Sequence, residues 1–510
     1  MRPLLPMFSL ALALSACPPA PPPALAPAPT PTPTPAPTPA PASLGGHGPR
    51  EVETPASTTV VIVGGGLAGL ISAHELHKRG IAFHLLEASD QLGGRLQTAY
   101  YAGGLHAEYG LQEVWADNPL VGIMKELAVP IDGKAEAPFS SMVLDGKLYP
   151  FVQDSNDEYF AAMMKPEEVQ QLKGWMSKAK ALRETALNSG LRSAEIAALQ
   201  NMSFSKWIES FSMSKRVNDW IRLTIECELA TSWEIFSAVV GLTEFGVFLG
   251  EGEPNYKVLG GNSLLIEALA NSAGQGSITR SALVQRVDRK KVGTKTVVTV
   301  SYLKGGHERT IEAEHVVVAV PPWRLHQIHF EPALAKKKWE GISTLMRGSY
   351  TVVHMVVNKA YHKLTYVNGV SPFPVLTDGV LGVVYGAQSE APPESANEVF
   401  AFLVHGNPAY SFHMQPREAK LKEMLAAMDK LWPGFSKHVV TSSAYTYHPG
   451  SISVWPMGRS PLDDKSEALR TPEDGVYLAG DWLWSGHSDG AAKSALAATS
   501  AIGALHQPKP

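Results

Sequence analysis

Residues 60–70 read VVIVGGGLAGL, and this stretch decides the fold of the chain. Four β-branched residues predict a buried strand, and Gly64, Gly66 and Gly69 follow it in GxGxxG spacing. In such units the first glycine permits a tight turn, the second lets the backbone approach a pyrophosphate, and the third lets the helix pack closely on the strand. The stretch therefore predicts a Rossmann-like unit that binds a nucleotide.

The residues after the glycine loop fit the same unit. A helix is predicted to begin at Leu67 and to end at Gly80. Its first turn, which contains Ala68, then directs the backbone amides and the helix dipole toward the phosphates. The next strand, IAFHLLE, ends at Glu87 and Ala88, and the acid lies about 20 residues beyond the loop, where it can bind a ribose. A glycine turn without function is the alternative, but the order of strand, loop, helix, strand and acid favours a nucleotide site.

The segment that follows Glu87 resembles the flavoproteins of the amine oxidase superfamily. Residues 88–98, ASDQLGGRLQT, are similar to the GG motif of that family. There Gly94 permits close backbone approach, and Arg95 can place a guanidinium near the flavin or the pyrophosphate. Ser89 and Gln91 stand where the family often has arginine. The resemblance implies that the nucleotide is FAD rather than NAD.

A second motif, near the C-terminus, is similar to the final flavin-binding segment of this family. Residues 475–498 read GVYLAGDWLWSGHSDGAAKSALAA, in which Gly480-Asp481 follows a strand and Asp489-Gly490-Ala491 opens a helix. The resemblance implies that the acid meets the ribityl-pyrophosphate part of FAD. It also implies that the helix N-terminus faces the carbonyl edge of the isoalloxazine ring.

These motifs predict an α/β fold with a discontinuous, Rossmann-like FAD-binding domain interleaved with an α+β substrate-binding domain. The strand ALVQRVDRK (282–290) resembles the one that lays a valine, here Val284, beside the adenine, although a plain buried strand explains it almost as well. Residues 163–190 have helical composition and are expected to cover the substrate domain. The expected segments are 58–135, 255–322 and 441–505 for the FAD-binding domain, and 136–254 and 323–440 for the substrate-binding domain.

The N-terminal residues predict export. Arg2 precedes the apolar run Leu4 to Leu14, and Leu14-Ser15-Ala16-Cys17 resembles the lipobox of bacterial lipoproteins. Residues 1–17 are therefore expected to be a lipoprotein signal peptide, and 18–57 an extended linker rich in Pro, Ala and Thr. A plain signal peptide with a chance cysteine is the alternative. The lipobox reading implies an exported protein on a bacterial membrane, periplasmic or surface-facing, held through its lipid anchor only.

The composition of the chain indicates which classes of molecule it is expected to bind. Hydrophobic residues make up 45% of the chain and charged residues 18%, as in an ordinary globular enzyme. The net charge of −4 gives no reason to expect nucleic acid. The 17 histidines follow no ligand spacing, and neither CxxC nor HExxH occurs, so the sequence predicts no metal site.

The branch of the family is indicated by residues 448–472, HPGSISVWPMGRSPLDDKSEALRTP, which are similar to polyamine oxidases. In the monoamine branch a cysteine at the position of Ser451 carries covalent flavin, so the serine implies noncovalent FAD. Ile452 and His487 stand where the family commonly has two aromatic rings in front of the flavin. The resemblance makes Ile452, His487 and Trp455 candidate catalytic residues, with Trp455 also expected to contact the cofactor. One interpretation makes His487 a substrate-orienting or acid–base residue, since its ordinary pKa near 6.5 suits both protonation states. The alternative is a structural ring at the flavin edge.

A further departure lies in residues 347–362, RGSYTVVHMVVNKAYH. Many family members carry a lysine here that holds a water against flavin N5 and assists reoxidation by oxygen. This lysine aligns with Val352 or Val353, and strand alternation puts His354 on the face opposite Val353. The electron acceptor is therefore expected to be O2 reacting slowly, or a membrane or periplasmic carrier.

The resemblance implies an FAD-dependent oxidoreductase that oxidises the C–N bond of a small-molecule amine. Hydride would pass to flavin N5, and water would hydrolyse the imine; a dehydrogenase is expected rather than a fast oxidase. The alternatives are a related flavoenzyme that desaturates C–C bonds, as carotenoid desaturases do, and a flavin-binding protein without turnover. The sequence alone places no acidic cluster in the substrate pocket.

Overall fold

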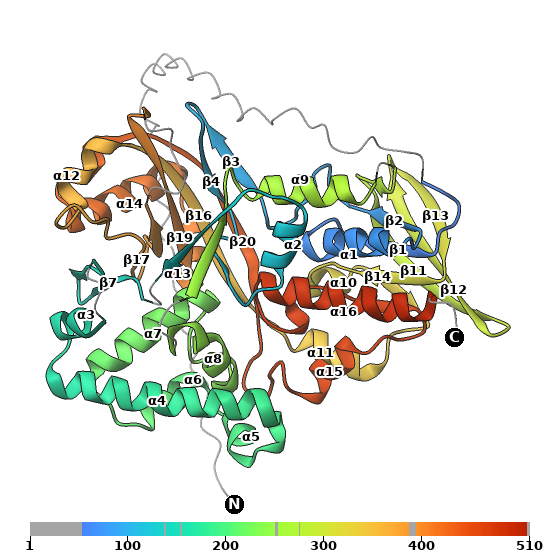
Figure 1. The fold of residues 1–510 in the computed structure, drawn as a ribbon, viewed down its shortest axis with the longest axis horizontal. Coiled ribbons are helices and arrows are strands. Elements are labelled where there is room, and N and C mark those ends of the chain that lie inside the picture. Colours follow the sequence, from blue (N-terminus) through green and yellow to red (C-terminus); the bar gives the residue numbers. More distant parts are fainter. Residues whose placement is uncertain are drawn as a thin grey trace, which may run out of the picture. The chain divides into compact units, whose positions relative to one another are not determined.

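The computed structural model describes residues 54–136, 139–152, 156–249, 253–274, 276–386 and 394–506. The expected signal peptide and nearly all of the expected linker lie outside these residues. Ser43–Pro510 forms one compact unit, whose elements are labelled in Figure 1. Within the described residues, none of the helices has both the length and the apolar character needed to cross a membrane.

A parallel sheet contains the first predicted strand. Val60–Val63 is fully buried, because Val60 and Ile62 pack on one side of the sheet while Val61 and Val63 pack on the other. Its strands come from all of the segments predicted for the FAD-binding domain. In spatial order they are β10 (Ile278–Thr279), β2 (Phe83–Leu86), β1 (Val60–Val63), β14 (His315–Val318) and β21 (Val476–Leu478).

Helices cover one face of the parallel sheet, and a second sheet covers the other (Figure 1). Helices pack on one face: α1 (Leu67–Lys78), α9 (Ser263–Ser272) and α16 (Ser488–His506). An antiparallel sheet with one parallel edge packs on the other: β13 (His307–Ala313), β12 (Lys295–Lys304), β11 (Leu283–Val292) and β15 (His329–Glu331).

A mixed sheet forms the second half of the unit. Its longest strands are β16 (Met346–Asn358) and β20 (Val439–Val454), which pair antiparallel. The remaining strands, in order from β16, are β19 (Asn397–His405), β18 (Val383–Tyr385), β17 (Val375–Leu376), β7 (Ser141–Leu144) and β8 (Lys147–Tyr149). One face carries α13 (Gly406–Met414) and α14 (Arg417–Leu431).

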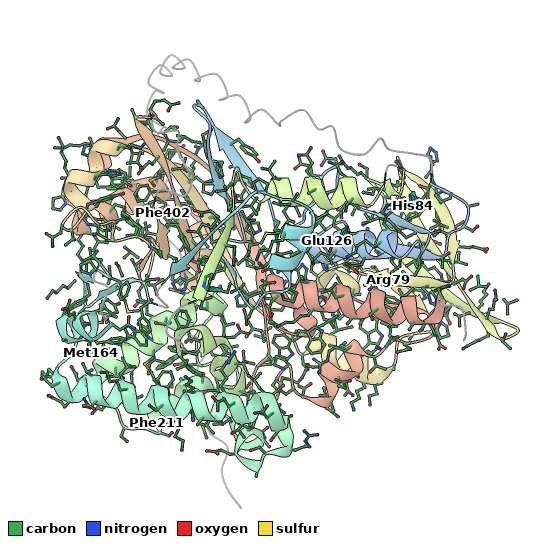
Figure 2. All side chains as sticks on the ribbon, viewed as in Figure 1. Arg79, His84, Glu126, Met164, Phe211 and Phe402 are labelled. Atoms are coloured by element: carbon green, nitrogen blue, oxygen red, sulfur yellow. The ribbon has the colours of Figure 1, made fainter. Side chains whose placement is uncertain are left out.

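A helical layer covers the other face of the mixed sheet. The predicted helix at 163–190 is α4, Pro166–Ser189. Figure 2 labels Met164 and Phe211 beside this layer and Phe402 within the mixed sheet. Besides α4, the layer contains α3 (Asn156–Met163), α5 (Ala194–Gln200), α6 (Phe204–Glu209), α7 (Lys215–Leu229) and α8 (Ala238–Glu244).

Shorter elements connect these layers. The hairpin β3–β4 (Thr98–Tyr101, Leu105–Glu108) and the sheet β5–β9–β6 (Val114–Trp115, Glu253–Val258, Ile131–Glu136) lie between the two halves along the chain. The other helices are α2 (Leu120–Glu126), α10 (Pro322–Leu325), α11 (Lys336–Ser343), α12 (His362–Thr365) and α15 (Asp464–Arg470).

Two predicted boundaries differ from the structure. The boundary at 440/441 cuts through β20, which pairs with β16 along its length and so belongs to the mixed sheet until Val454. The predicted linker also extends too far. Glu312 N donates to Ala56 O at 3.0 Å and Thr58 N donates to Glu312 O at 2.9 Å, so residues 56–58 already pair with β13.

Candidate active site

A cavity of about 1460 Å³ joins the two halves of the unit. The carboxyl ends of β1, β2 and β14 contribute Gly64, Glu87 and Ala319, and the mixed sheet contributes Val352 and Leu403. Ligands of open parallel sheets bind outside these carboxyl ends. Since pockets for single small ligands measure about 300–1,000 Å³, this cavity has room for a dinucleotide together with a substrate.

The glycine loop leaves a space for phosphate at the expected position. A Cβ added to Gly64 would lie 2.7 Å from Ala319 O, and one added to Gly69 would lie 1.9 Å from Gly64 O, so both glycines permit close packing. A Cβ at Gly66 would meet nothing within 4 Å, and Gly66 lines the cavity with Leu67 and Ala68. The first turn of α1 therefore points its amides into open space, as a bound pyrophosphate requires.

Glu87 is fixed at the edge of this space. Its carboxylate accepts hydrogen bonds from Gly65 N at 2.6 Å and Ser89 N at 2.8 Å, and it lines the cavity beside Ala88. Two backbone donors leave lone pairs free for ribose hydroxyls. Val284 lines the cavity nearby, on β11.

Arg95 and Asp481 join the two predicted motifs. Arg95 donates to both carboxylate oxygens of Asp481, at 2.6 and 3.0 Å, and to Ser451 O at 2.5 Å. Burial opposes the charge on Arg95, but Asp481 outweighs it and raises the pKa of the guanidinium. Both side chains line the cavity, as do Gly94 and Gly480. This bidentate pair holds the C-terminal segment against the GG motif.

The start of α16 forms another part of the wall. Asp489 and Ala491 line the cavity, whereas Gly490 serves packing, because a Cβ there would lie 2.7 Å from Asp481 O. The Asp489 carboxylate accepts from Lys493 Nζ at 2.8 Å and from the Ser485 hydroxyl. The N-terminus of α16 therefore faces the cavity, and the carboxylate of Asp489 there is already hydrogen-bonded to Ser485 and Lys493.

His487 and Ile452 also line the cavity. Nε2 of His487 lies 3.2 Å from a carboxylate oxygen of Glu244, the last residue of α8. Burial alone would lower the pKa of His487, but Glu244 outweighs burial and raises it to about 9. The imidazole is therefore protonated at neutral pH rather than poised between two states.

Carboxylates that the sequence could not place also line the cavity: Glu113, Glu228 and Glu244. The charges of Glu228 and Glu244 both act on His487. Burial raises the pKa of Glu228, which lies at the last turn of α7. Among the described residues, no side chain donates a hydrogen bond to its carboxylate. The nearby Tyr350 hydroxyl donates to the carbonyl of Cys227 instead. Glu228 and Glu244 sit on helices without a local motif, so only the fold brings them together.

Trp455 lies outside the cavity wall. Its side chain is completely buried, does not line the cavity, and donates from Nε1 to Ser466 Oγ at 3.1 Å. The structure therefore does not place Trp455 in the cavity wall, and its contact with cofactor and substrate stays a prediction. The indole stabilises the turn between β20 and α15 instead.

Of the two valines at the expected lysine position, only one lines the cavity. Val352 lines the cavity and packs with the helical layer, whereas Val353 packs on the opposite face of the mixed sheet. His354 does not line the cavity. The Tyr109 ring stacks on its imidazole, with the ring centroids 4.7 Å apart, and the Tyr101 hydroxyl forms a hydrogen bond with its Nδ1 at 2.7 Å. Val352 is therefore the position that faces the expected flavin site.

Among the residues described around the cavity, none is a cysteine. Cys227 is buried, with its Sγ 3.3 Å from His405 Nε2, and Cys17 lies outside the described residues. Ser451 Oγ donates to His448 O at 3.0 Å. The cavity therefore offers no thiol for a covalent flavin link, in line with noncovalent FAD.

The family model for flavin containing amine oxidoreductases matches residues 67–503 of the chain. The chain belongs to this family. It is therefore an FAD-dependent oxidoreductase that oxidises C–N bonds of amines, and the open cradle at Gly66 and Glu87 fits this cofactor.

Curated relatives match over most of their length. Human amine oxidase [flavin-containing] B is 22% identical over 466 residues, covering 85% of this chain and 84% of the relative. Nicotine dehydrogenase of Pseudomonas putida is 23% identical over 468 residues, covering 86% and 87%. Among solved structures, cyclohexylamine oxidase from Brevibacterium oxydans has a TM-score of 0.74 at 19% identity, covering 88% of this chain and 99% of that one. This last similarity establishes the α/β fold alone.

Proposed function

We propose that the cavity binds FAD on a Rossmann-like domain at its glycine-loop end and a small cationic amine at its His487 end. The observation that carries this proposal is the presence of Glu228, Glu244 and His487 in the same cavity as the Gly66 cradle. When bound, FAD supplies the hydride acceptor of the reaction. The chain's own residues bind the amine, remove its proton and exclude water.

Charge at the substrate end favours a cation. Glu228 and Glu244 contribute two carboxylates, and His487 offsets one of them through its 3.2 Å contact with Glu244. The remaining negative charge at Glu228 attracts an ammonium group in a site of low dielectric constant. An uncharged polyene would leave the carboxylate of Glu228 without a partner in the cavity, which argues against C–C desaturation.

Glu228 also takes the ammonium proton in this proposal. An amine must lose that proton before its neighbouring carbon can release hydride. His487 is already protonated below a pKa of about 9, so it cannot serve as the base. Since burial raises the pKa of Glu228, its carboxylate accepts a proton more readily than an exposed carboxylate does. His487 then acts as a positioning residue, which holds Glu244.

Apolar side chains exclude water around the reacting carbon. Ile452, Val352 and Leu403 line the cavity and are nearly or completely buried. Such walls strengthen each electrostatic contact inside the site.

We also propose that the electron acceptor is a membrane or periplasmic carrier rather than O2. Support comes from Val352, which lines the cavity at a position where the resemblance implies a lysine, and from a relative named nicotine dehydrogenase. The lipobox-like residues up to Cys17 and the proline-rich linker support an exported protein held on a bacterial membrane by its lipid. Labelling of full-length protein with a radioactive fatty acid, lost in Cys17→Ala, tests that anchor.

An anaerobic screen tests the substrate class. Protein lacking residues 1–42 is mixed with monoamines, diamines, amino acids or polyenes, and bleaching of the flavin absorbance is followed. Amines should bleach the flavin and polyenes should not. Bleaching by polyenes alone would overturn the proposal, and bleaching by neither class would favour a protein without turnover.

A further inference from the structure

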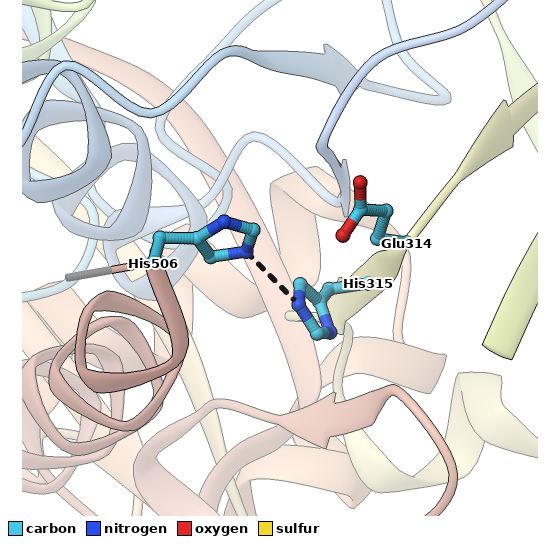
Figure 3. Close-up of side chains that lie close together, drawn as sticks. All are labelled: Glu314, His315 and His506. Carbon is cyan, nitrogen blue, oxygen red and sulfur yellow. Dashed lines mark hydrogen bonds between the residues drawn. The ribbon is translucent and has the colours of Figure 1, made fainter. Parts of the chain in front are cut away.

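The C-terminal end of α16 brings together side chains that no sequence spacing connects. Figure 3 shows His506, the last residue of α16, beside Glu314 and His315 at the start of β14. One nitrogen or oxygen atom of each side chain lies within 4.8 Å of those of the other two. From these contacts we propose that Glu314, His315 and His506 bind a divalent transition metal such as Zn²⁺.

The separation of the imidazoles carries the proposal. Nε2 of His315 lies 3.2 Å from Nε2 of His506. Two histidine nitrogens bound to tetrahedral zinc at about 2.0–2.1 Å lie about 3.3–3.4 Å apart. The two rings therefore already stand at nearly the spacing that one shared metal ion imposes.

The chemistry of the donors suits the same metal. Two imidazoles and one carboxylate form a set that zinc commonly takes, with water in the remaining position. The edge of Tyr477 contacts the His315 ring, with centroids 5.6 Å apart, and limits its rotation.

The other described cluster of this kind differs in one respect. His74, Glu75 and Glu126 also lie within ligand distance of one another. There Lys78 Nζ donates to Glu75 and Glu126, both at 2.9 Å, so an ammonium already neutralises the carboxylates. No lysine or arginine described in the structure forms an ion pair with Glu314.

A metal here would fasten two elements that also line the FAD cavity. The first turn of α16 contributes Asp489 and Ala491 to the cavity, and its last residue is the ligand His506. Likewise β14 begins at His315 and leads to Ala319 at the cavity wall. The bound ion would hold the far ends of both elements together, which stabilises the folded state by mass action.

Calorimetric titration of the full-length holoenzyme, chelator-treated and without a histidine tag, tests the site with ZnCl₂. We expect one Zn²⁺ per chain, and at least a tenfold loss of affinity in His506→Ala and in Glu314→Gln. The matched control is His307→Ala, which removes an exposed histidine on β13 and should leave the affinity unchanged. MgCl₂ should not bind, because Mg²⁺ prefers oxygen ligands.

Thermal unfolding gives a second readout. At a hundredfold excess of Zn²⁺ over Kd, Tm should rise by roughly 3 °C for a chain of this size, and the rise should vanish in His506→Ala. Equal Zn²⁺ affinity in the holoenzyme and in His506→Ala would overturn the proposal. So would the absence of binding, which would leave the two rings as a histidine–histidine hydrogen bond. Neither result bears on amine oxidation, because no ligand of this site lines the cavity.

Discussion

Replacement of Glu244 by glutamine should remove a pH-dependent part of the folding stability. In the native protein the pKa of His487 rises from 6.5 to about 9: burial lowers it, and the charge of Glu244, 3.2 Å away, outweighs burial. A shift of this size corresponds to about 3 kcal/mol, since each pKa unit is worth about 1.4 kcal/mol. The two side chains are 30% and 14% exposed, so solvent screening reduces our expectation to about 2 kcal/mol.

The sign follows from the raised pKa. A histidine with a raised folded-state pKa stabilises the protein fully below its unfolded pKa of 6.5, and this contribution is lost as the pH rises toward 9. The stability difference between the wild-type protein and Glu244→Gln should therefore shrink by about 2 kcal/mol from pH 6 to pH 9. In Tm this is roughly 2 °C for a chain of this size.

The assay is thermal unfolding at several pH values in excess FAD. Glu234→Gln is the matched control, because Glu234 is exposed and follows α7 in the same layer. Its difference from the wild-type protein should not depend on pH. A Glu244→Gln difference that stays constant from pH 6 to pH 9 would refute the ion pair.

Further expectations concern the cofactor loop and the lysine position. Glu87→Ala should weaken FAD binding by roughly 1.5–3 kcal/mol, the worth of hydrogen bonds to a charged group, and unchanged flavin content after dialysis would contradict this. Gly66→Val should lose FAD but keep the Tm of the apoprotein, because the valine side chain enters open space. Gly69→Val should lower the Tm, because its side chain meets Gly64 O. Equal Tm values for the two variants would contradict the close packing of Gly69. Val352→Lys should raise the rate of flavin reoxidation by oxygen at least tenfold, about 1.4 kcal/mol of barrier, as measured by stopped-flow absorbance. Val353→Lys should destabilise the core without raising that rate, since Val353 is buried on the other face.

The nucleotide-binding end of the cavity could be predicted from the sequence because its motifs are local. A strand, a glycine loop and an acid lie within one short segment, so their spacing alone places Gly64, Gly66 and Glu87 at the carboxyl ends of two neighbouring parallel strands. The resemblance placed Arg95 and Asp481 near the same cofactor, from segments 386 residues apart, but it predicted no contact between them. The pair itself is a result of the structure.

The residues at the substrate end of the cavity could not be predicted from sequence motifs. Glu228 and Glu244 occupy the ends of separate helices, and no spacing rule links them to His487. The sequence could not show that the Trp455 side chain lies outside the cavity wall, because a motif match specifies neighbours along the chain, whereas burial decides which way the indole points. The predicted boundary at 440/441 lies inside β20, because this strand pairs with β16 from Val439 to Val454.

The most direct measurement is the anaerobic rate of flavin reduction by an amine, compared between the wild-type protein and Glu228→Gln across pH. We expect the amine to bleach bound FAD in both proteins, with at least a tenfold slower limiting rate in Glu228→Gln, about 1.4 kcal/mol of barrier. As the pH rises, the amine loses its own proton in solution, so the two rates should converge. Rates that are equal at every pH would show that Glu228 takes no proton from the substrate, and a wild-type flavin that no amine reduces would contradict amine oxidation in this cavity.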